Sequence, residues 1–147
     1  MPLRPRCHGF TLLELLVVLT LLGLILGLVA PRLGAGMPGV SARAAASDVA
    51  GVLRAARSQA LTEQRTVSVV IDTESRHVGF AGREQSLADA VALEMPGVEA
   101  ARRELRFYPD GSSTGVELRV ARGAHRYRVV LDWLTGDVQV VPEAGDG

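Results

Sequence analysis

The sequence has no lysine, because all 16 of its basic residues are arginine. The lack of lysine excludes Schiff-base catalysis and any phosphate-binding loop that depends on a lysine side chain. Cys7 is the only cysteine, which excludes an intramolecular disulfide and a metal cluster held by several thiolates. The three histidines, His8, His77 and His125, are far apart in the sequence. We therefore expect no metal, no cofactor and no enzymatic activity.

The charges of the chain are balanced. Sixteen arginines stand against 16 acidic residues, so the formal net charge is zero. A neutral chain argues against a protein built mainly to coat nucleic acid. The length of 147 residues leaves room for one domain of modest size.

The apolar residues are concentrated near the N-terminus. Residues Phe10 to Ala30 contain one charged side chain, Glu14. A helix of this length reaches about 30 Å, the thickness of a bilayer core. Arg4 and Arg6 precede it without an acid, which predicts a cytoplasmic N-terminus, a single pass through the inner membrane and a periplasmic C-terminal part. We expect residues 10–30 to contact membrane lipid.

Three interpretations of this segment compete. A secretory signal peptide would be shorter and would end in a small-residue cleavage site, whereas this run continues into Pro31 and Arg32. A lipoprotein signal would place a cysteine after the apolar run, but Cys7 lies before it. A plain membrane anchor does not account for Glu14, because an acid in a spanning helix costs about 3 kcal/mol. Glu14 is therefore a candidate functional residue.

The string GFTLLELLVVL, from Gly9 to Leu19, resembles the class III signal of type IV pilins and type II secretion pseudopilins. The resemblance implies that residues 1–9 are a leader, cleaved after Gly9 by a prepilin peptidase that then methylates the new N-terminus of Phe10. Glu14 would be the fifth residue of the mature chain. Residues 10–31 would be the transmembrane and assembly helix.

Elementary electrostatics gives Glu14 a role as well. Cleavage would leave an ammonium group on Phe10, and a buried cation and a buried carboxylate each need a counter-ion. Glu14 lies one helical turn further on, so it could pair with its own terminus or with that of a neighbouring subunit. The sequence does not decide between the two pairings, although the resemblance implies the intersubunit one, in which Glu14 sets the assembly register.

A joint rich in glycine and proline follows, at residues 32–41. We expect Ser41 to cap a second helix that begins at about Ala42 and ends near Arg65. Its apolar positions fall on one helical stripe, which we expect to pack on a sheet: Ala45, Val49, Val52, Leu53, Ala56 and Ala60.

The rest of the chain alternates as strands do. Residues 66–72 and 76–81 predict a hairpin, whereas residues 82–104 mix helix formers with Pro96 and Gly97 and favour only a short strand at 91–95. Four further strands are predicted at residues 105–108, 116–121, 127–131 and 138–141. The fold class is therefore α+β, a long N-terminal helix packed on antiparallel sheet structure. The resemblance of Gly9 to Leu19 implies that this arrangement is type IV pilin-like, with the first half of the helix in the membrane and a periplasmic domain at residues 42–147.

The stretches Arg106–Gly115 and Tyr127–Val140 resemble the H-type minor pseudopilins of type II secretion and the related FimT-like minor pilins. The resemblance implies a structural subunit of the periplasmic pseudopilus that drives folded proteins across the outer membrane. Its implied partners are the prepilin peptidase, other minor pseudopilins, the major pseudopilin and the inner-membrane assembly platform. The alternative is a FimT-like minor type IV pilin involved in pilus assembly or DNA uptake.

The remaining reactive residue types have simpler explanations. Asp110 and Gly111 are typical turn residues, so we expect a turn at this position and not a site with a serine nucleophile. We expect Trp133 to lie in the core. His77 and His125 are expected on strand surfaces, and Asp137 is not in a calcium-loop pattern.

Arginines are frequent in the C-terminal half, and positions 126 and 128 would share one strand face. We interpret them as a solvated face balanced by Glu99, Glu104 and Glu117 rather than as a phosphate-binding patch, and do not expect nucleic acid as a partner. The arginines concerned are Arg102, Arg103, Arg106, Arg119, Arg122, Arg126 and Arg128.

Overall fold

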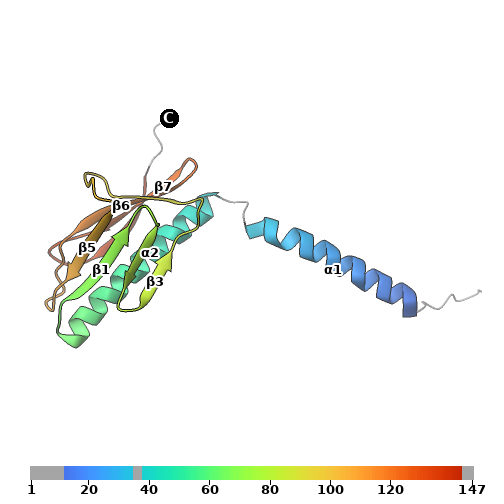
Figure 1. The fold of residues 1–147 in the computed structure, drawn as a ribbon, viewed down its shortest axis with the longest axis horizontal. Coiled ribbons are helices and arrows are strands. Elements are labelled where there is room, and N and C mark those ends of the chain that lie inside the picture. Colours follow the sequence, from blue (N-terminus) through green and yellow to red (C-terminus); the bar gives the residue numbers. More distant parts are fainter. Residues whose placement is uncertain (1–11, 35–37, 144–147) are drawn as a thin grey trace, which may run out of the picture. The chain divides into compact units, whose positions relative to one another are not determined.

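The computed structural model describes residues 12–34 and 38–143. The chain divides into two compact units, Met1–Met37 and Pro38–Gly147. The described part of the first unit is a single helix, α1 (Leu12–Gly34), which continues through Pro31 (Figure 1). Within the described residues, no helix combines the length and the apolar character needed to cross a membrane.

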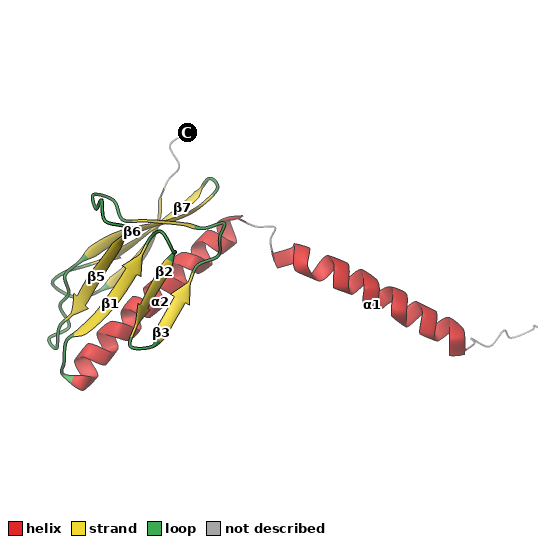
Figure 2. Ribbon diagram, viewed as in Figure 1, coloured by secondary structure: helices red, strands yellow, loops and turns green. Residues whose placement is uncertain are grey.

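The described residues of the second unit, 38–143, form one helix and eight strands. Figure 2 shows the helix lying along the sheet structure. The helix is α2 (Pro38–Glu63), and all the strands follow it in the sequence. The strands are β1 (Val67–Asp72), β2 (His77–Phe80), β3 (Arg83–Ser86), β4 (Ala92–Glu94), β5 (Arg102–Phe107), β6 (Val116–Arg122), β7 (His125–Leu131) and β8 (Val138–Glu143).

The strands form two four-stranded sheets, in the orders β3-β2-β1-β5 and β4-β6-β7-β8. Every pairing is antiparallel. In the second sheet, Arg119 of β6 lies opposite Arg128 of β7, and Arg126 of β7 lies opposite Glu143 of β8. The α+β class and the predicted β1–β2 hairpin are thus confirmed.

Helix α2 contributes an alanine-rich face to a core that both sheets share. Five residues of the predicted stripe are buried, and Val52 is partly buried. Small side chains allow the helix to approach the strands closely, and the strands supply the larger groups, among them Ile71, Leu105, Phe107 and Leu118. The predicted packing of this helix on sheet structure is therefore confirmed.

The start of α2 differs from the prediction. The helix begins at Pro38 rather than at Ala42, because proline is well suited to a first helical position, where its missing N–H is not needed. Ser41 lies inside the helix and does not cap it. The Ser41 hydroxyl donates a hydrogen bond to the Pro38 carbonyl oxygen at 2.9 Å and accepts one from Arg122 of β6.

Residues 82–104 are more regular than the sequence indicated. The predicted strand at 91–95 is present as β4, but β3 was not predicted, because its sequence REQS has no apolar alternation. Backbone pairing with β2 forms this strand at the sheet edge. The segment also places Leu87, Val91 and Met95 in the core.

The expectation that Trp133 lies in the core is wrong. Its side chain is 65% exposed, and that of the neighbouring Leu134 is 62% exposed. Both residues lie in the loop that follows β7, whereas alternate residues of β7 itself, Val129 and Leu131, point into the core.

Candidate functional site

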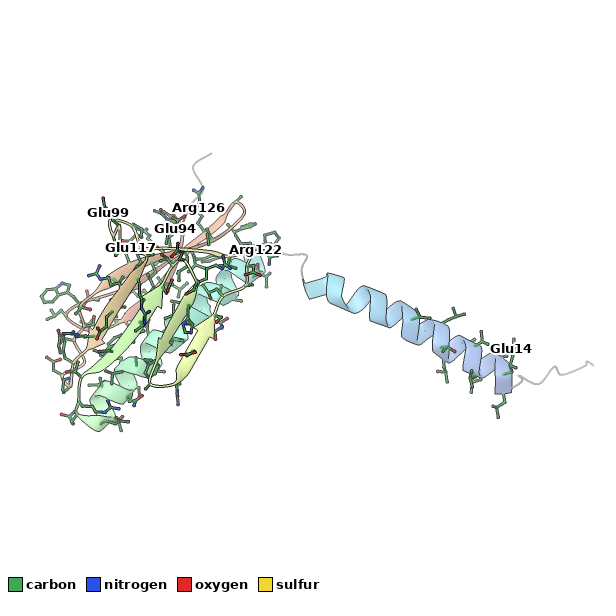
Figure 3. All side chains as sticks on the ribbon, in the orientation of Figure 1. Glu14, Glu94, Glu99, Glu117, Arg122 and Arg126 are labelled. Atoms are coloured by element: carbon green, nitrogen blue, oxygen red, sulfur yellow. The ribbon has the colours of Figure 1, made fainter. Side chains whose placement is uncertain are left out.

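Glu14 lies in the first turn of α1, where a carboxylate interacts favourably with the helix dipole (Figure 3). The side chains around it, such as Leu13, Leu15 and Leu16, are largely exposed in the chain on its own. Gly9 and Phe10 lie outside the described residues, so the relation between Glu14 and the Phe10 terminus stays a prediction.

The outer face of the second sheet carries alternating charges that are paired with one another. Arg119 donates two hydrogen bonds to Glu143, from Nε at 2.8 Å and from Nη2 at 3.1 Å. Its Nη1 also lies 3.6 Å from Glu94, and Arg128 lies 3.6 Å from Glu117. Antiparallel pairing places these long side chains next to one another across strands β4, β6, β7 and β8. We call Glu94, Glu117, Arg119, Arg126, Arg128 and Glu143 the charged face.

The charged face holds three arginines and three glutamates, and the pairing affects their titration. The hydrogen bonds from Arg119 lower the pKa of Glu143, with Arg128 and Arg126 adding to the effect. The same contact raises the pKa of Arg119. Figure 3 shows Glu94, Glu117 and Arg126 gathered over this sheet. Arg119 and Arg128 are therefore paired with carboxylates, and Arg126 lies opposite Glu143 in the strand register.

The predicted balance of charge is confirmed for two of its three glutamates, and two glutamates outside the prediction also pair with arginine. Glu117 pairs with Arg128, and Glu104 pairs with Arg106 at 3.5 Å. Glu99 lies exposed in the loop before β5, and Glu94 and Glu143 provide the remaining negative charge on the charged face. Glu94 and Glu143 could have been found only by knowing the strand pairing.

His77 and His125 occupy the strand surfaces predicted for them. His77 lies 3.6 Å from the Glu84 carboxylate across β2 and β3. The ring of His125 packs against the first turn of α2, so that a Cβ added to Gly39 would lie 3.2 Å from it. No three metal-binding side chains come together among residues 12–34 and 38–143.

The sequence DGSSTG forms a turn. The side chain of Asp110 accepts hydrogen bonds from the backbone N–H of Ser112 at 3.0 Å and from its hydroxyl at 2.6 Å. These bonds, from the hydroxyl first, lower the pKa of Asp110. Ser113 is buried and donates to the Asp132 carbonyl oxygen at 3.1 Å, so its hydroxyl is engaged in the backbone rather than available as a nucleophile.

A second turn, after β7, is organised by Asp132. Its carboxylate accepts bonds from the backbone N–H of Thr135 at 2.8 Å, the Thr135 hydroxyl at 2.9 Å and the N–H of Leu134 at 3.0 Å. The two bonds from Thr135 are the main reason that the pKa of Asp132 lies below its ordinary value. Arg57 of α2 connects this turn to the DGSSTG turn, because it donates to the carbonyl oxygens of Thr135 and Gly111.

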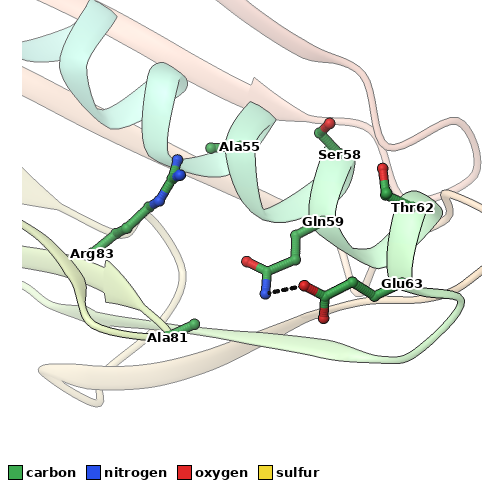
Figure 4. Close-up of a pocket in the computed structure, with 7 residues that line it drawn as sticks. All are labelled: Ala55, Ser58, Gln59, Thr62, Glu63, Ala81 and Arg83. Atoms are coloured by element: carbon green, nitrogen blue, oxygen red, sulfur yellow. Dashed lines mark hydrogen bonds between the residues drawn. The ribbon is translucent and has the colours of Figure 1, made fainter.

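A polar hollow lies between α2 and the β2–β3 turn (Figure 4). Its helical side carries Ser58, Thr62 and a hydrogen bond of 2.9 Å from Gln59 to Glu63. Arg83 lines the strand side. The lining of this hollow contains neither a histidine nor a cysteine.

The comparisons with known proteins agree with this architecture. The family described as "Prokaryotic N-terminal methylation motif" matches residues 4–30, and "Type II transport protein GspH" matches residues 45–136. The chain is 30% identical, over 145 residues, to type II secretion system protein H of Xanthomonas campestris pv. campestris. That match covers 95% of this chain and 86% of the relative.

Two solved structures show the same fold. The minor pseudopilin EpsH of Vibrio cholerae has a TM-score of 0.59 at 17% identity, covering 69% of this chain and 97% of EpsH. The type IV minor pilin FimU of Pseudomonas aeruginosa has a TM-score of 0.55 at 16% identity, covering 68% of this chain and 92% of FimU. Three findings agree: the fold is pilin-like, the GspH family matches most of the folded domain, and the relative aligns over nearly the whole chain. The chain therefore belongs to the GspH family of type II secretion minor pseudopilins.

Proposed function

We propose that the chain is made as an inner-membrane precursor, cleaved between Gly9 and Phe10 by a prepilin peptidase and methylated on Phe10. The observation that carries this proposal is the N-terminal methylation motif at residues 4–30, joined in one chain to a GspH domain. Arg4 and Arg6 ahead of the apolar run favour a cytoplasmic N-terminus, a single pass and a periplasmic folded domain.

In this proposal the mature chain enters a pseudopilus together with other minor pseudopilins and the major pseudopilin, assembled on the inner-membrane platform. The filament then drives folded proteins through the outer membrane. The chain acts as a building block and performs no chemistry of its own. Packing of parallel apolar helices supplies the association energy, and Glu14 sets the register by pairing with the Phe10 ammonium of a neighbouring subunit.

A role in a type IV pilus is not favoured over secretion. The likeness to FimU concerns the fold alone, whereas the relative aligned along nearly the whole chain is a secretion protein. The charged face also lacks an excess of positive charge that would attract DNA.

Mass spectrometry of the N-terminus from native membranes tests the proposal. We expect a chain that begins at methylated Phe10. Gly9→Ala should leave the leader attached, because the peptidase requires that glycine. Gly23→Ala is the matched control, since a Cβ at Gly23 meets nothing within 4 Å and α1 should be processed normally. A native chain that still begins at Met1 would overturn the proposal.

A further inference from the structure

We propose that one end of the folded domain is a docking surface for the globular domain of a neighbouring pseudopilin, whose contacting face is apolar with a basic rim. The surface, called here the loop platform, consists of Leu61, Tyr108, Trp133 and Leu134. This inference rests on the proposed assembly into a pseudopilus and names one of the contacts through which that assembly is made.

The loop platform combines two strongly exposed apolar residues with two partly exposed ones. Trp133 and Leu134 are 65% and 62% exposed, whereas Leu61 and Tyr108 are 37% and 36% exposed. They lie at one end of the domain, because α2 ends beside the two turns that follow β5 and β7. Contiguous exposed apolar groups mark interaction sites, and tryptophan and tyrosine are enriched among the residues that dominate binding.

Hydrogen bonds hold the backbone that carries the exposed pair. Asp132 accepts hydrogen bonds from the backbone of Leu134 and Thr135, and the N–H of Ser113 donates to the Trp133 carbonyl oxygen at 2.8 Å. Arg57 bonds the same turn to α2 at 2.7 Å. A turn whose backbone is fixed before binding loses less conformational entropy when the partner arrives, which favours affinity.

The charges around the loop platform indicate the chemistry of the partner. Asp110, Asp132 and Asp137 are exposed in the two turns. Arg57 points inward to backbone carbonyl oxygens, and Arg65 is paired with Glu63. The platform is therefore apolar with an acidic border, and a complementary face would carry arginine or lysine around an apolar centre.

The class of partner follows from the family. Subunits of this family interact with other pseudopilins, and the platform is an end of the domain, where consecutive subunits of a filament can meet head to tail. A second copy of this chain and an exported protein are the competing occupants, and the experiment separates them.

The test uses the full-length chain in native membranes, with a photo-crosslinking amino acid in place of Leu134. We expect an adduct that antibodies identify as another pseudopilin of the same secretion system. Trp133→Ala should weaken that adduct about tenfold, as expected for an anchor tryptophan. Trp133→Phe should largely retain it, which separates lost binding from lost folding.

Val40→Ala is the matched control, because Val40 is 64% exposed but lies at the other end of α2. It should leave the adduct unchanged. The proposal is overturned if position 134 gives no pseudopilin adduct, if the adduct contains only a second copy or an exported protein, or if Trp133→Ala has no effect. The N-terminal mass is measured in the same samples. A processed chain without the adduct overturns only the proposed docking surface. An unprocessed chain overturns both the proposed function and the docking surface.

Discussion

Arg57 and Thr135 are 78 positions apart in the sequence and are joined by a hydrogen bond of 2.7 Å, from the Nη2 of Arg57 to the Thr135 carbonyl oxygen. The Nε of the same guanidinium donates to the Gly111 carbonyl oxygen at 3.3 Å. One side chain of α2 therefore positions both turns that carry the loop platform. A lysine could not replace it, because a single ammonium does not reproduce the planar arrangement of donors.

Arg57→Ala should destabilise the folded domain. The substitution leaves two backbone carbonyl oxygens without their charged donor. We expect the free energy of unfolding to fall by about 1–3 kcal/mol. Hydrogen bonds to charged groups contribute about 1.5–3 kcal/mol, and the lower end of the expected range reflects the partial exposure of this site. Urea unfolding of the full chain in detergent, followed by circular dichroism, measures the change. Arg43→Ala, at an exposed position of the same helix, is the control; an equal loss in both variants would contradict the prediction.

Gly136→Ala should be more damaging than Arg57→Ala. Gly136 has a φ of 65°, and an added Cβ would collide with the Gly111 carbonyl oxygen and lie 2.8 Å from the Nε of Arg57. Strain and collision together should cost about 3 kcal/mol or more. The same urea experiment measures the loss.

Gly123→Ala provides the comparison for Gly136. Its φ of 58° is similar, but nothing lies within 4 Å of its added Cβ. It should therefore show only the backbone strain, about 1 kcal/mol. The prediction is wrong if the two alanine variants have the same urea midpoint.

The stability of the domain should fall in acid, and Asp132 should account for part of the loss. Hydrogen bonds from Thr135 and Leu134 hold its pKa below the ordinary value of 3.8. A carboxylate with a lower pKa in the folded state stabilises the fold above its unfolded pKa, and this contribution disappears as the pH falls through the folded pKa. Hydrogen bonds lower the pKa values of Asp72 and Asp110 in the same way, so their contributions have the same sign.

Asp132→Asn isolates this contribution. Unfolding free energies measured from about pH 6 down to about pH 2 should fall less steeply for the variant than for the parent chain, because the variant has one carboxylate fewer to protonate. Asp48→Asn, on the exposed part of α2, makes the same chemical change away from the turn and should alter neutral-pH stability little. Parallel curves for Asp132→Asn and the parent would refute the assignment.

Most of the folded domain follows from local patterns in the sequence. The helical stripe from Ala45 to Ala60 and the β-branched run at residues 66–72 each match one period, so they predict the correct element. Pro38 falls in the predicted joint because proline breaks helices. Proline also starts helices well, and here it is the first residue of α2. Strand β3 depends on pairing with β2, which no pattern within REQS reveals.

The functional surfaces were harder to predict than the fold. The sequence predicts Trp133 in the core because it lies beside the apolar residues Leu131 and Leu134. Its exposure depends on the turn that Asp132, Ser113 and Arg57 hold together, and these contacts join distant parts of the chain. The balance on the charged face likewise depends on strand register, since Arg119 meets Glu143 only across β7.

The charged face predicts weak affinity for DNA. Arg119 and Arg128 are paired with carboxylates and the face carries equal numbers of arginines and glutamates, so the full chain should not shift DNA fragments at about 150 mM salt, where few phosphate contacts give little binding. Glu94→Gln combined with Glu143→Gln should introduce salt-sensitive binding, because Arg119 would lose both partners. Gln139→Glu is a control that adds negative charge near the same strands and should not promote binding. Strong binding by the parent chain would contradict the interpretation of this face.

Glu14→Ala should separate processing from assembly. The substitution leaves Gly9 and Phe10 intact, so the leader should still be removed and Phe10 methylated. Without the carboxylate, the Phe10 ammonium loses its proposed counter-ion in the packed helices, and breaking a buried ion pair costs about 3–5 kcal/mol. We therefore expect the amount of this chain in isolated filaments to fall by more than about tenfold. Thr20→Ala is the control on the same helix, because its hydroxyl already bonds to the Leu16 carbonyl oxygen. Incorporation of Glu14→Ala at the parental level would show that α1 keeps its register without this residue.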